Sequence, residues 1–295
     1  SNLYHTYEYS KETMRGKSEL KQEGAAASQT SSGLDRDYIT NWSYGIGETL
    51  TLLVPNVKGG GSGATMSQSE VAMAKANPMY NGIYSQLPQY FGEQPWTAGP
   101  VYVGAFVMFL FVLGCFIVKG PLKWALLGAT IFSILLSWGK NFMGLTDFFI
   151  DYVPMYNKFR AVSSILVIAE FTIPLLAIFA LKEILSKPDM LKQEKNCRGV
   201  IAALVLTAGV ALVLAVAPGV FFSSFITTQE MAALQQALPA EHLAPFVANL
   251  TEMREAIIAS DAWRSFFIIV IGCLFLFLYQ LRKLKASFTL AGIAL

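Results

Sequence analysis

The sequence predicts an all-α polytopic membrane protein. We expect about five complete transmembrane helices, a truncated sixth, a large extracytoplasmic N-terminal segment and an extracytoplasmic amphipathic helix. Two observations carry this prediction. Hydrophobic residues make up 54% of the 295-residue chain and charged residues only 14%, whereas soluble domains carry about 25% charged residues. Apolar runs also recur at lengths near the roughly 20 residues that a helix needs to cross a bilayer.

The composition also argues against several functional classes. The net charge is only +2, and such a balance gives no basic surface for nucleic acid. The chain has two histidines and three cysteines, without a CxxC pair. A zinc site or a disulfide framework is therefore not expected.

The apolar runs divide the chain into an extracytoplasmic segment, 1–99, and a transmembrane bundle, 100–295. The expected spans lie near 101–118, 124–138, 161–181, 200–222, 265–281 and, truncated, 286–295. An extracytoplasmic insert occupies 223–264. Because ten residues are too few to cross a bilayer, we expect the natural chain to continue beyond the sixth run.

The distribution of positive charge predicts which loops face the cytoplasm, since short cytoplasmic loops collect Lys and Arg. Ten basic residues lie on one side: Lys119, Lys123, Lys182, Lys187, Lys192, Lys195, Arg198, Arg282, Lys283 and Lys285. The opposite short loops carry five: Lys140, Lys158, Arg160, Arg254 and Arg264. Segments 1–99, 139–160 and 223–264 are therefore expected to be extracytoplasmic. With no signal peptide in 1–99, an earlier helix is expected upstream.

Local structure is also expected in the extracytoplasmic parts. Residues 24–33 have the composition of a linker, and 37–53 are expected to form a helix that stops before Pro55. Residues 77–100 are rich in Pro, Tyr, Gly and Trp, which is typical either of an aromatic belt at the membrane surface or of a ligand-facing loop.

The insert 223–264 shows two helical patterns separated by Pro239. The first is a short helix at 229–238. The second is an amphipathic helix, whose apolar residues between 243 and 257 recur at helical spacing. A packing role at the outer interface is the favoured interpretation of this second helix.

The loop 140–160 holds the first group of candidate functional residues. Asp147 and Asp151 share one face if the segment is helical, and Lys158 and Arg160 follow at the start of the third span. A cation pair at a membrane surface is suited to phosphate, and paired carboxylates suit a metal ion or a general base. The alternative is a solvated loop whose acids pair with its own bases.

Two isolated glutamates complete the candidates. Glu170 lies inside the third apolar run, four residues before Pro174. An ionisable group at membrane depth marks either a functional cavity or a hydrogen bond that holds helices together. Glu48 lies between Gly47 and Thr49, and by itself it is a weaker signal.

Three strings of the sequence resemble the bacterial YfhO family of large polytopic membrane proteins, in the form found in Bacteroidetes. They are WSYGIGETLTLLVPNVKGGG at 42–61, QYFGEQPWTAGPVYVGA at 89–105 and LSWGKNFMGLTDFFIDYVPMYNKFRAVSS at 136–164. The element from Pro154 to Arg160 is the most specific part. On this resemblance the chain is an internal fragment of a multi-pass protein of the bacterial inner (plasma) membrane.

The resemblance implies a function, because YfhO proteins are similar to GT-C glycosyltransferases. Those enzymes transfer a sugar from a polyprenyl-phosphate donor on the extracytoplasmic face, here to an acceptor in the cell envelope. Their catalytic carboxylate lies in a first outer loop, which would precede residue 1. The fragment would then carry the binding half: Lys158 and Arg160 facing the lipid phosphate, and Glu48, Asp147 or Asp151 contacting the sugar or a divalent metal ion.

Two alternatives remain open. A transporter or flippase for a lipid-linked envelope intermediate would make better use of Glu170 and Pro174, because transporters place polar groups near the midplane. A non-enzymatic envelope assembly protein would use the outer segments as partner surfaces.

Overall fold

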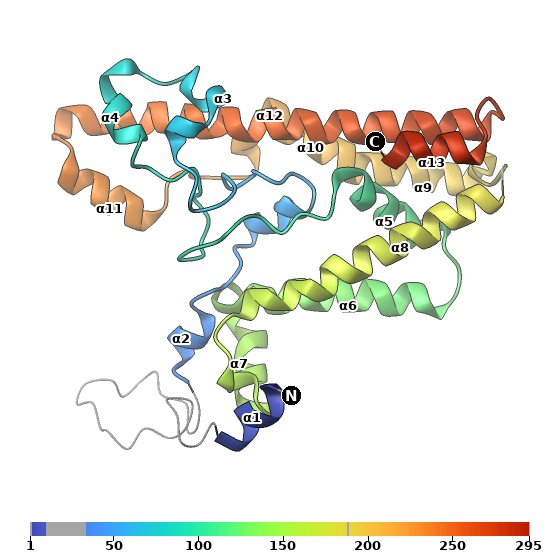
Figure 1. Ribbon diagram of the computed structural model, residues 1–295, viewed down its shortest axis with the longest axis horizontal. Coiled ribbons are helices and arrows are strands. Elements are labelled where there is room, and N and C mark those ends of the chain that lie inside the picture. Colours follow the sequence, from blue (N-terminus) through green and yellow to red (C-terminus); the bar gives the residue numbers. More distant parts are fainter. Residues whose placement is uncertain (1, 10–33, 188, 295) are drawn as a thin grey trace. The chain divides into compact units, whose positions relative to one another are not determined.

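The computed structural model describes residues 2–9, 34–187 and 189–294 and is helical (Figure 1). Within these ranges it contains no strand, and the one isolated bridge pairs Thr65 with Pro88. The linker expected at 24–33 lies outside the described residues. The chain forms two compact units. Unit 1 comprises Ser1–Ile46, Glu93–Pro95 and Ile131–Ala169, and unit 2 comprises Gly47–Gly92, Trp96–Thr130 and Glu170–Leu295.

The described helices before residue 85 are short, and most of those after residue 104 are longer. In chain order they are α1 (Asn2–Tyr9), α2 (Arg36–Thr40), α3 (Glu70–Met73), α4 (Asn81–Tyr84), α5 (Ala105–Ile117), α6 (Pro121–Ser137), α7 (Met143–Tyr152), α8 (Val167–Ser186), α9 (Glu194–Leu204), α10 (Val210–Val216), α11 (Thr228–Ala237), α12 (Ala240–Gln280) and α13 (Ala286–Ala294). A π-helical turn at Val205–Gly209 joins α9 and α10.

Three helical segments are long and apolar enough to cross a membrane: Val162–Ser186, Glu194–Val216 and Ala240–Gln280. A fourth span results if α6 and the helical segment Gly139–Tyr152 are taken together. The chain bends by 110° between these two segments. Only 28–39% of the apolar windows of the three long helices is buried, and exposed apolar surface of this extent is typical of contact with lipid. The chain is therefore an all-α membrane protein with three to four candidate spans.

The prediction of five complete spans is not met at 101–118. Helix α5 has 13 residues, which is about 20 Å at a helical rise of 1.5 Å per residue and less than the ~30 Å of hydrocarbon. Gly104 has a φ of +101° and keeps the residues before it out of the helix. At the other end Val118 is extended, and Gly120 has a φ of +102°.

Two further predicted boundaries are wrong. The amphipathic helix at 243–257 and the span at 265–281 are one helix, α12, because no break separates them. Helix α12 continues through Pro245, its sixth residue. The helix expected at 37–53 is instead two short pieces, α2 and the 3₁₀ helix Gly47–Leu52. The short helix expected at 229–238 is confirmed as α11.

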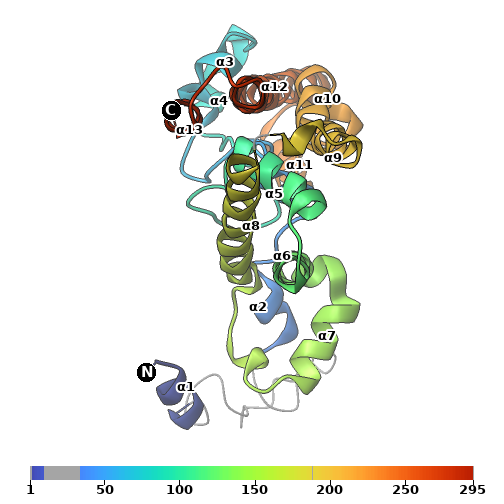
Figure 2. The ribbon, with the colours of Figure 1, turned by 90° about the vertical axis from the view of Figure 1, so that its right-hand side faces the viewer.

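Helix α12 is the axis of unit 2, and α5, α10 and α13 pack along it (Figures 1 and 2). Glycine permits the closest approach, since a Cβ on Gly272 would lie 2.3 Å from the ring of Phe106 in α5. A hydrogen bond of 2.7 Å between the hydroxyls of Thr130 and Thr172 links α6 to α8. Small residues and hydroxyl pairs are the usual means of helix association in a membrane.

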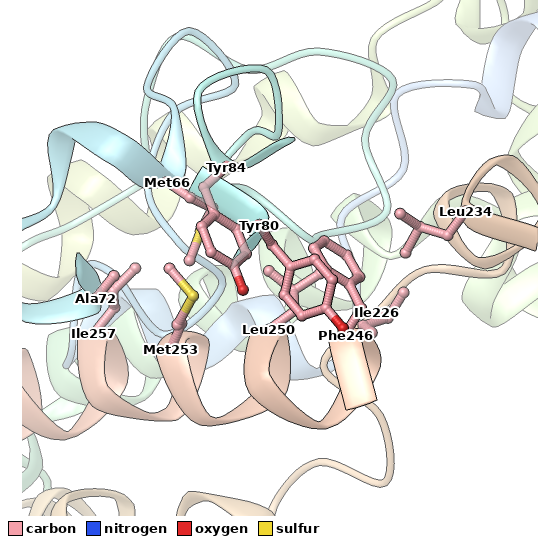
Figure 3. Close-up of a cluster of buried hydrophobic side chains, with 10 residues drawn as sticks. All are labelled: Met66, Ala72, Tyr80, Tyr84, Ile226, Leu234, Phe246, Leu250, Met253 and Ile257. Carbon is pink, nitrogen blue, oxygen red and sulfur yellow. The ribbon is translucent and has the colours of Figure 1, made fainter. Parts of the chain in front are cut away.

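The N-terminal half of α12 is covered by what we name the head module, residues 65–91 and 225–258, all in unit 2. Helices α3, α4 and α11 gather around this half of α12 (Figure 1). Its buried core is formed by Met66, Ala72, Tyr80, Tyr84, Ile226, Leu234, Phe246, Leu250, Met253 and Ile257 (Figure 3). The rings of Tyr84 and Phe246 stack at 5.6 Å.

An ion pair lies inside the head module. Arg254 is fully buried and donates two hydrogen bonds to the carboxylate of Glu230, at 2.7 and 2.8 Å. The same guanidinium also donates to the backbone carbonyls of Phe225 and Pro88 and lies over the ring of Phe91. One side chain of α12 therefore ties together the two segments that cover it.

We predict that Glu230→Gln destabilises the head module by about 3–5 kcal/mol, because it leaves the charge of Arg254 buried without a counter-charge. Thermal unfolding in detergent measures the loss. The matched control is Glu252→Gln, which removes an exposed ion pair with Lys75 of 3.5 Å and should cost less than about 1 kcal/mol. Equal losses in the two variants would contradict the prediction.

Burial raises the pKa of Tyr84 from its ordinary value of 10.0 to about 12. The Tyr84 hydroxyl donates to Asn249 Oδ1 at 2.5 Å, so the neutral phenol is the bound form. Its contribution is present below pH 10, where the unfolded chain keeps the proton, and is lost as pH rises toward 12.

We therefore predict that the melting temperature of the head module falls between pH 10 and pH 12, and that Tyr84→Phe makes this fall shallower. Replacing the exposed Tyr152 by Phe is the control and should leave the fall unchanged. An identical alkaline fall in Tyr84→Phe and the wild-type protein would refute the assignment.

Candidate functional site

The candidate residues of the loop 140–160 lie in unit 1, where α2 and α7 share a small core. Leu34, Ile39, Ile150 and Val162 form this core, with Tyr38 and Tyr156 packed against it. The amide of Leu34 donates to the carbonyl of Asn157 at 3.0 Å. Helix α2 begins at a capped end, since Asp35 accepts a hydrogen bond from the amide of Asp37.

Asp147 and Asp151 share one face of α7, as their spacing predicts, and both bind the guanidinium of Arg36. Arg36 Nη2 lies 2.8 Å from Asp151 Oδ1, and Nη1 hydrogen-bonds to Asp147. The hydrogen bond to Asp151, with the nearby carboxylate charges, raises the pKa of Arg36 further above its ordinary value. The two acids therefore fasten α7 to α2, and their counter-charge is an arginine from the N-terminal segment.

Arg160 lies just before the 3₁₀ helix Val162–Leu166, which leads into α8. Its guanidinium lies 5.1 Å from the ring centre of Trp42 and 5.7 Å from that of Tyr38. Nη1 donates to the Tyr38 hydroxyl at 2.9 Å. Among the described residues no carboxylate pairs with Arg160, and its side chain is exposed. Arg160 is thus an exposed arginine that lies beside two aromatic rings.

Lys158 is the last residue of a 3₁₀ turn, Tyr156–Lys158, two positions before Arg160. Met155, which precedes the turn, has a φ of +68°, in the left-handed region. Lys158 is partly buried and has a contact of its own. Arg160 is therefore the more accessible of the two cations.

Glu48 lies in unit 2 and is almost completely buried. The hydroxyl of Tyr90 donates to Glu48 Oε1 at 2.6 Å. Gly92 approaches this pair so closely that a Cβ would lie 2.2 Å from Glu48 Oε1. Through these contacts Glu48 joins the 3₁₀ helix Gly47–Leu52 to the segment around Tyr90, in the interior of unit 2.

Glu170 lies in the first turn of α8 and is exposed. It is the ninth of the 25 residues of the helical segment Val162–Ser186, four residues before the midpoint. Helix α8 continues through Pro174 as one helix. Glu170 therefore lies inside the candidate span, about 6 Å along the helix from its midpoint.

The described part of the chain holds no group of three or more His, Cys, Asp or Glu side chains that could bind a metal ion. At the pair of carboxylates on α7, the positive charge comes from Arg36. A divalent ion at Asp147 and Asp151 would have to displace this guanidinium, so the donor set does not favour a metal site there.

The sequence reasoning missed the residues that organise these groups. Arg36 lies 111 and 115 positions from its two partners, and no local pattern connects them. Arg254 was expected only as a basic residue of an extracytoplasmic segment, and no sequence pattern indicated that it is buried with Glu230. Trp42 stands in the first string of the family resemblance, which was the one available signal of its role.

No protein-family model, no curated protein and no solved structure matches this chain.

We predict that Arg36→Gln loosens α7, because one substitution removes both hydrogen-bonded ion pairs. Partly exposed pairs of this kind contribute about 1 kcal/mol together, which corresponds to a roughly fivefold faster hydrogen exchange of the α7 amides. Arg198→Gln, which removes an exposed pair with Glu194 on α9, should leave α7 unchanged. Unaltered exchange in Arg36→Gln would show that the pairs do not hold the helix.

Proposed function

We propose that this chain belongs to a membrane glycosyltransferase of the GT-C type and binds the phosphate of a polyprenyl-linked sugar donor. The observation that carries the proposal is Arg160, an exposed arginine held over two aromatic rings at the start of a membrane span. The end of a span is where lipid phosphates lie. A guanidinium presents paired N–H donors that match phosphate oxygens.

The neighbouring side chains support the same ligand. The nearby rings of Trp42 and Tyr38 and the hydrogen bond to the Tyr38 hydroxyl restrict the guanidinium, so less entropy is lost when it binds an anion. Lys158 lies two residues away and adds positive charge. Aromatic faces next to charged donors also suit the apolar faces of a sugar ring.

The other candidates receive narrower roles. Asp147 and Asp151 act through Arg36 by positioning α7, and Glu48 acts within the interior of unit 2. A catalytic carboxylate and a polyprenyl-phosphate sugar as partner remain part of the proposal on the family resemblance. Glu170 lies inside the candidate span, about 6 Å from its midpoint, and this position is the observation that favours the transport alternative.

A non-enzymatic role in envelope assembly is the second candidate, because the head module is a separate packed body on α12. Such a role needs a partner protein at the head module and no lipid phosphate at Arg160. The two candidates therefore differ in a direct binding measurement.

We predict that Arg160→Gln weakens binding of a fluorescent polyprenyl phosphate by tenfold or more, which is about 1.4 kcal/mol. Binding is measured with the protein in lipid nanodiscs. Arg282→Gln, which removes an exposed arginine paired with Asp189, is the matched control and should bind like the wild-type protein. Equal affinities in all three proteins, or no binding by any of them, would reject the proposal and favour the assembly role.

A further inference from the structure

Helix α7 carries an aromatic face that the described residues of unit 1 leave uncovered. Thr146 and Ile150 are buried on its inner side, whereas Phe148 is 53% exposed and Tyr152 is 75% exposed. The rings of Phe148 and Tyr152 lie 5.3 Å apart, and Phe149 lies 5.8 Å from Phe148. Large aromatic side chains exposed as one group indicate an interaction surface.

This surface is continuous with an apolar face of α6. Phe132 of α6 is exposed, and its ring lies 5.5 Å from that of Phe149. Ile131 beside it is also exposed. Helix α6 has 17 mostly apolar residues, about 25 Å in length, and meets the criteria for a membrane span only together with Gly139–Tyr152. Its exposed apolar side chains are suited to contact with lipid. The ring contacts from Phe132 to Phe149 carry this surface onto α7 without a break.

The bend between the two helices sets the direction of α7. The segment Gly139–Tyr152 turns from α6 by 110°, and Gly139 has a φ of +46° at the turn. A Cβ on Gly139 would lie 2.1 Å from the Ser43 hydroxyl oxygen, so another residue does not fit there. If α6 crosses the bilayer, α7 lies close to the membrane plane.

The charges on α7 fix its depth. Asp147 and Asp151, bound to Arg36, lie on the flank next to the aromatic face and remain partly exposed. Placing three charged groups in the hydrocarbon core would cost several kcal/mol even when they are paired. In the interfacial layer each face of such an amphipathic helix has a suitable environment. The aromatic side enters lipid, and the charges stay in water.

We propose that α7 is an interfacial helix whose aromatic face, formed by Phe148, Phe149 and Tyr152, contacts the glycerol and upper acyl-chain region of the bilayer. This placement depends on the membrane character of α6 and is independent of sugar transfer. It makes lipid, and no other protein, the occupant of this face.

Site-directed fluorescence in lipid vesicles tests the placement. Cys115, Cys197 and Cys273 are first replaced by Ala, and an environment-sensitive dye is then attached in two single-cysteine proteins, Phe148→Cys and Tyr152→Cys. Ile131→Cys on the lipid-facing side of α6 and Gln236→Cys on the exposed side of α11 are the controls. Each protein is titrated with aqueous iodide and with lipids that carry a nitroxide quencher at a shallow or a deep acyl position.

The dyes at 148 and 152 should be quenched by the shallow nitroxide lipid and protected from iodide several-fold relative to Gln236→Cys. Iodide quenching equal to that at Gln236 would show a solvated face. Protection from iodide and from both lipids would show a protein occupant, and stronger quenching by the deep lipid would show a re-entrant helix. Each of these three results overturns the proposal. Tyr152→Cys, at the most exposed position, keeps the test valid if Phe148→Cys perturbs α7.

Discussion

Helix α12 has 41 residues and extends about 60 Å, twice the thickness of the hydrocarbon layer that one of its halves must cross. The other half needs a cover made of protein, and the head module supplies it. That cover consists of two segments far apart in the sequence, and Arg254 joins both to the helix through Glu230 and two backbone carbonyls. Breaking this ion pair would leave a charge in a dry interior. The half of α12 that extends beyond the hydrocarbon layer therefore depends on the buried Arg254 to keep its cover in place.

In unit 1 an arginine also joins segments that lie far apart in the sequence. The acids of α7 are held by Arg36, which comes from the N-terminal segment, and this leaves Arg160 on its aromatic support without a carboxylate partner among the described residues. The ion pairs of Arg36 therefore stabilise the structure, whereas Arg160 is available to a ligand. The aromatic face of α7 and the guanidinium of Arg160 both suit the interfacial layer, where lipid glycerol and phosphate groups lie.

The sequence predicts those features that depend on local pattern. Run length identified the helices at 161–181, 200–222 and 265–281 as membrane spans, and helical spacing placed Asp147 and Asp151 on one face. It did not predict that α5 is short, because that depends on the positive φ of Gly104. Nor did it find Arg36 or the burial of Arg254, since a contact between residues far apart leaves no periodic signal. The shared face of Asp147 and Asp151 is therefore confirmed, whereas their common partner, Arg36, was not predicted.

The position of the bilayer along α12 is the central claim, and thiol accessibility measures it most directly. In a cysteine-free background, single cysteines are placed at exposed positions of α12, Ala248, Glu252, Ser260, Phe267, Ile271 and Leu274, and treated in sealed vesicles with a membrane-impermeant thiol reagent supplied to both sides. Positions up to Ser260 should react rapidly, and those from Phe267 onward should not react. Slow reaction at Ala248 and Glu252, or rapid reaction at Ile271, would contradict the account.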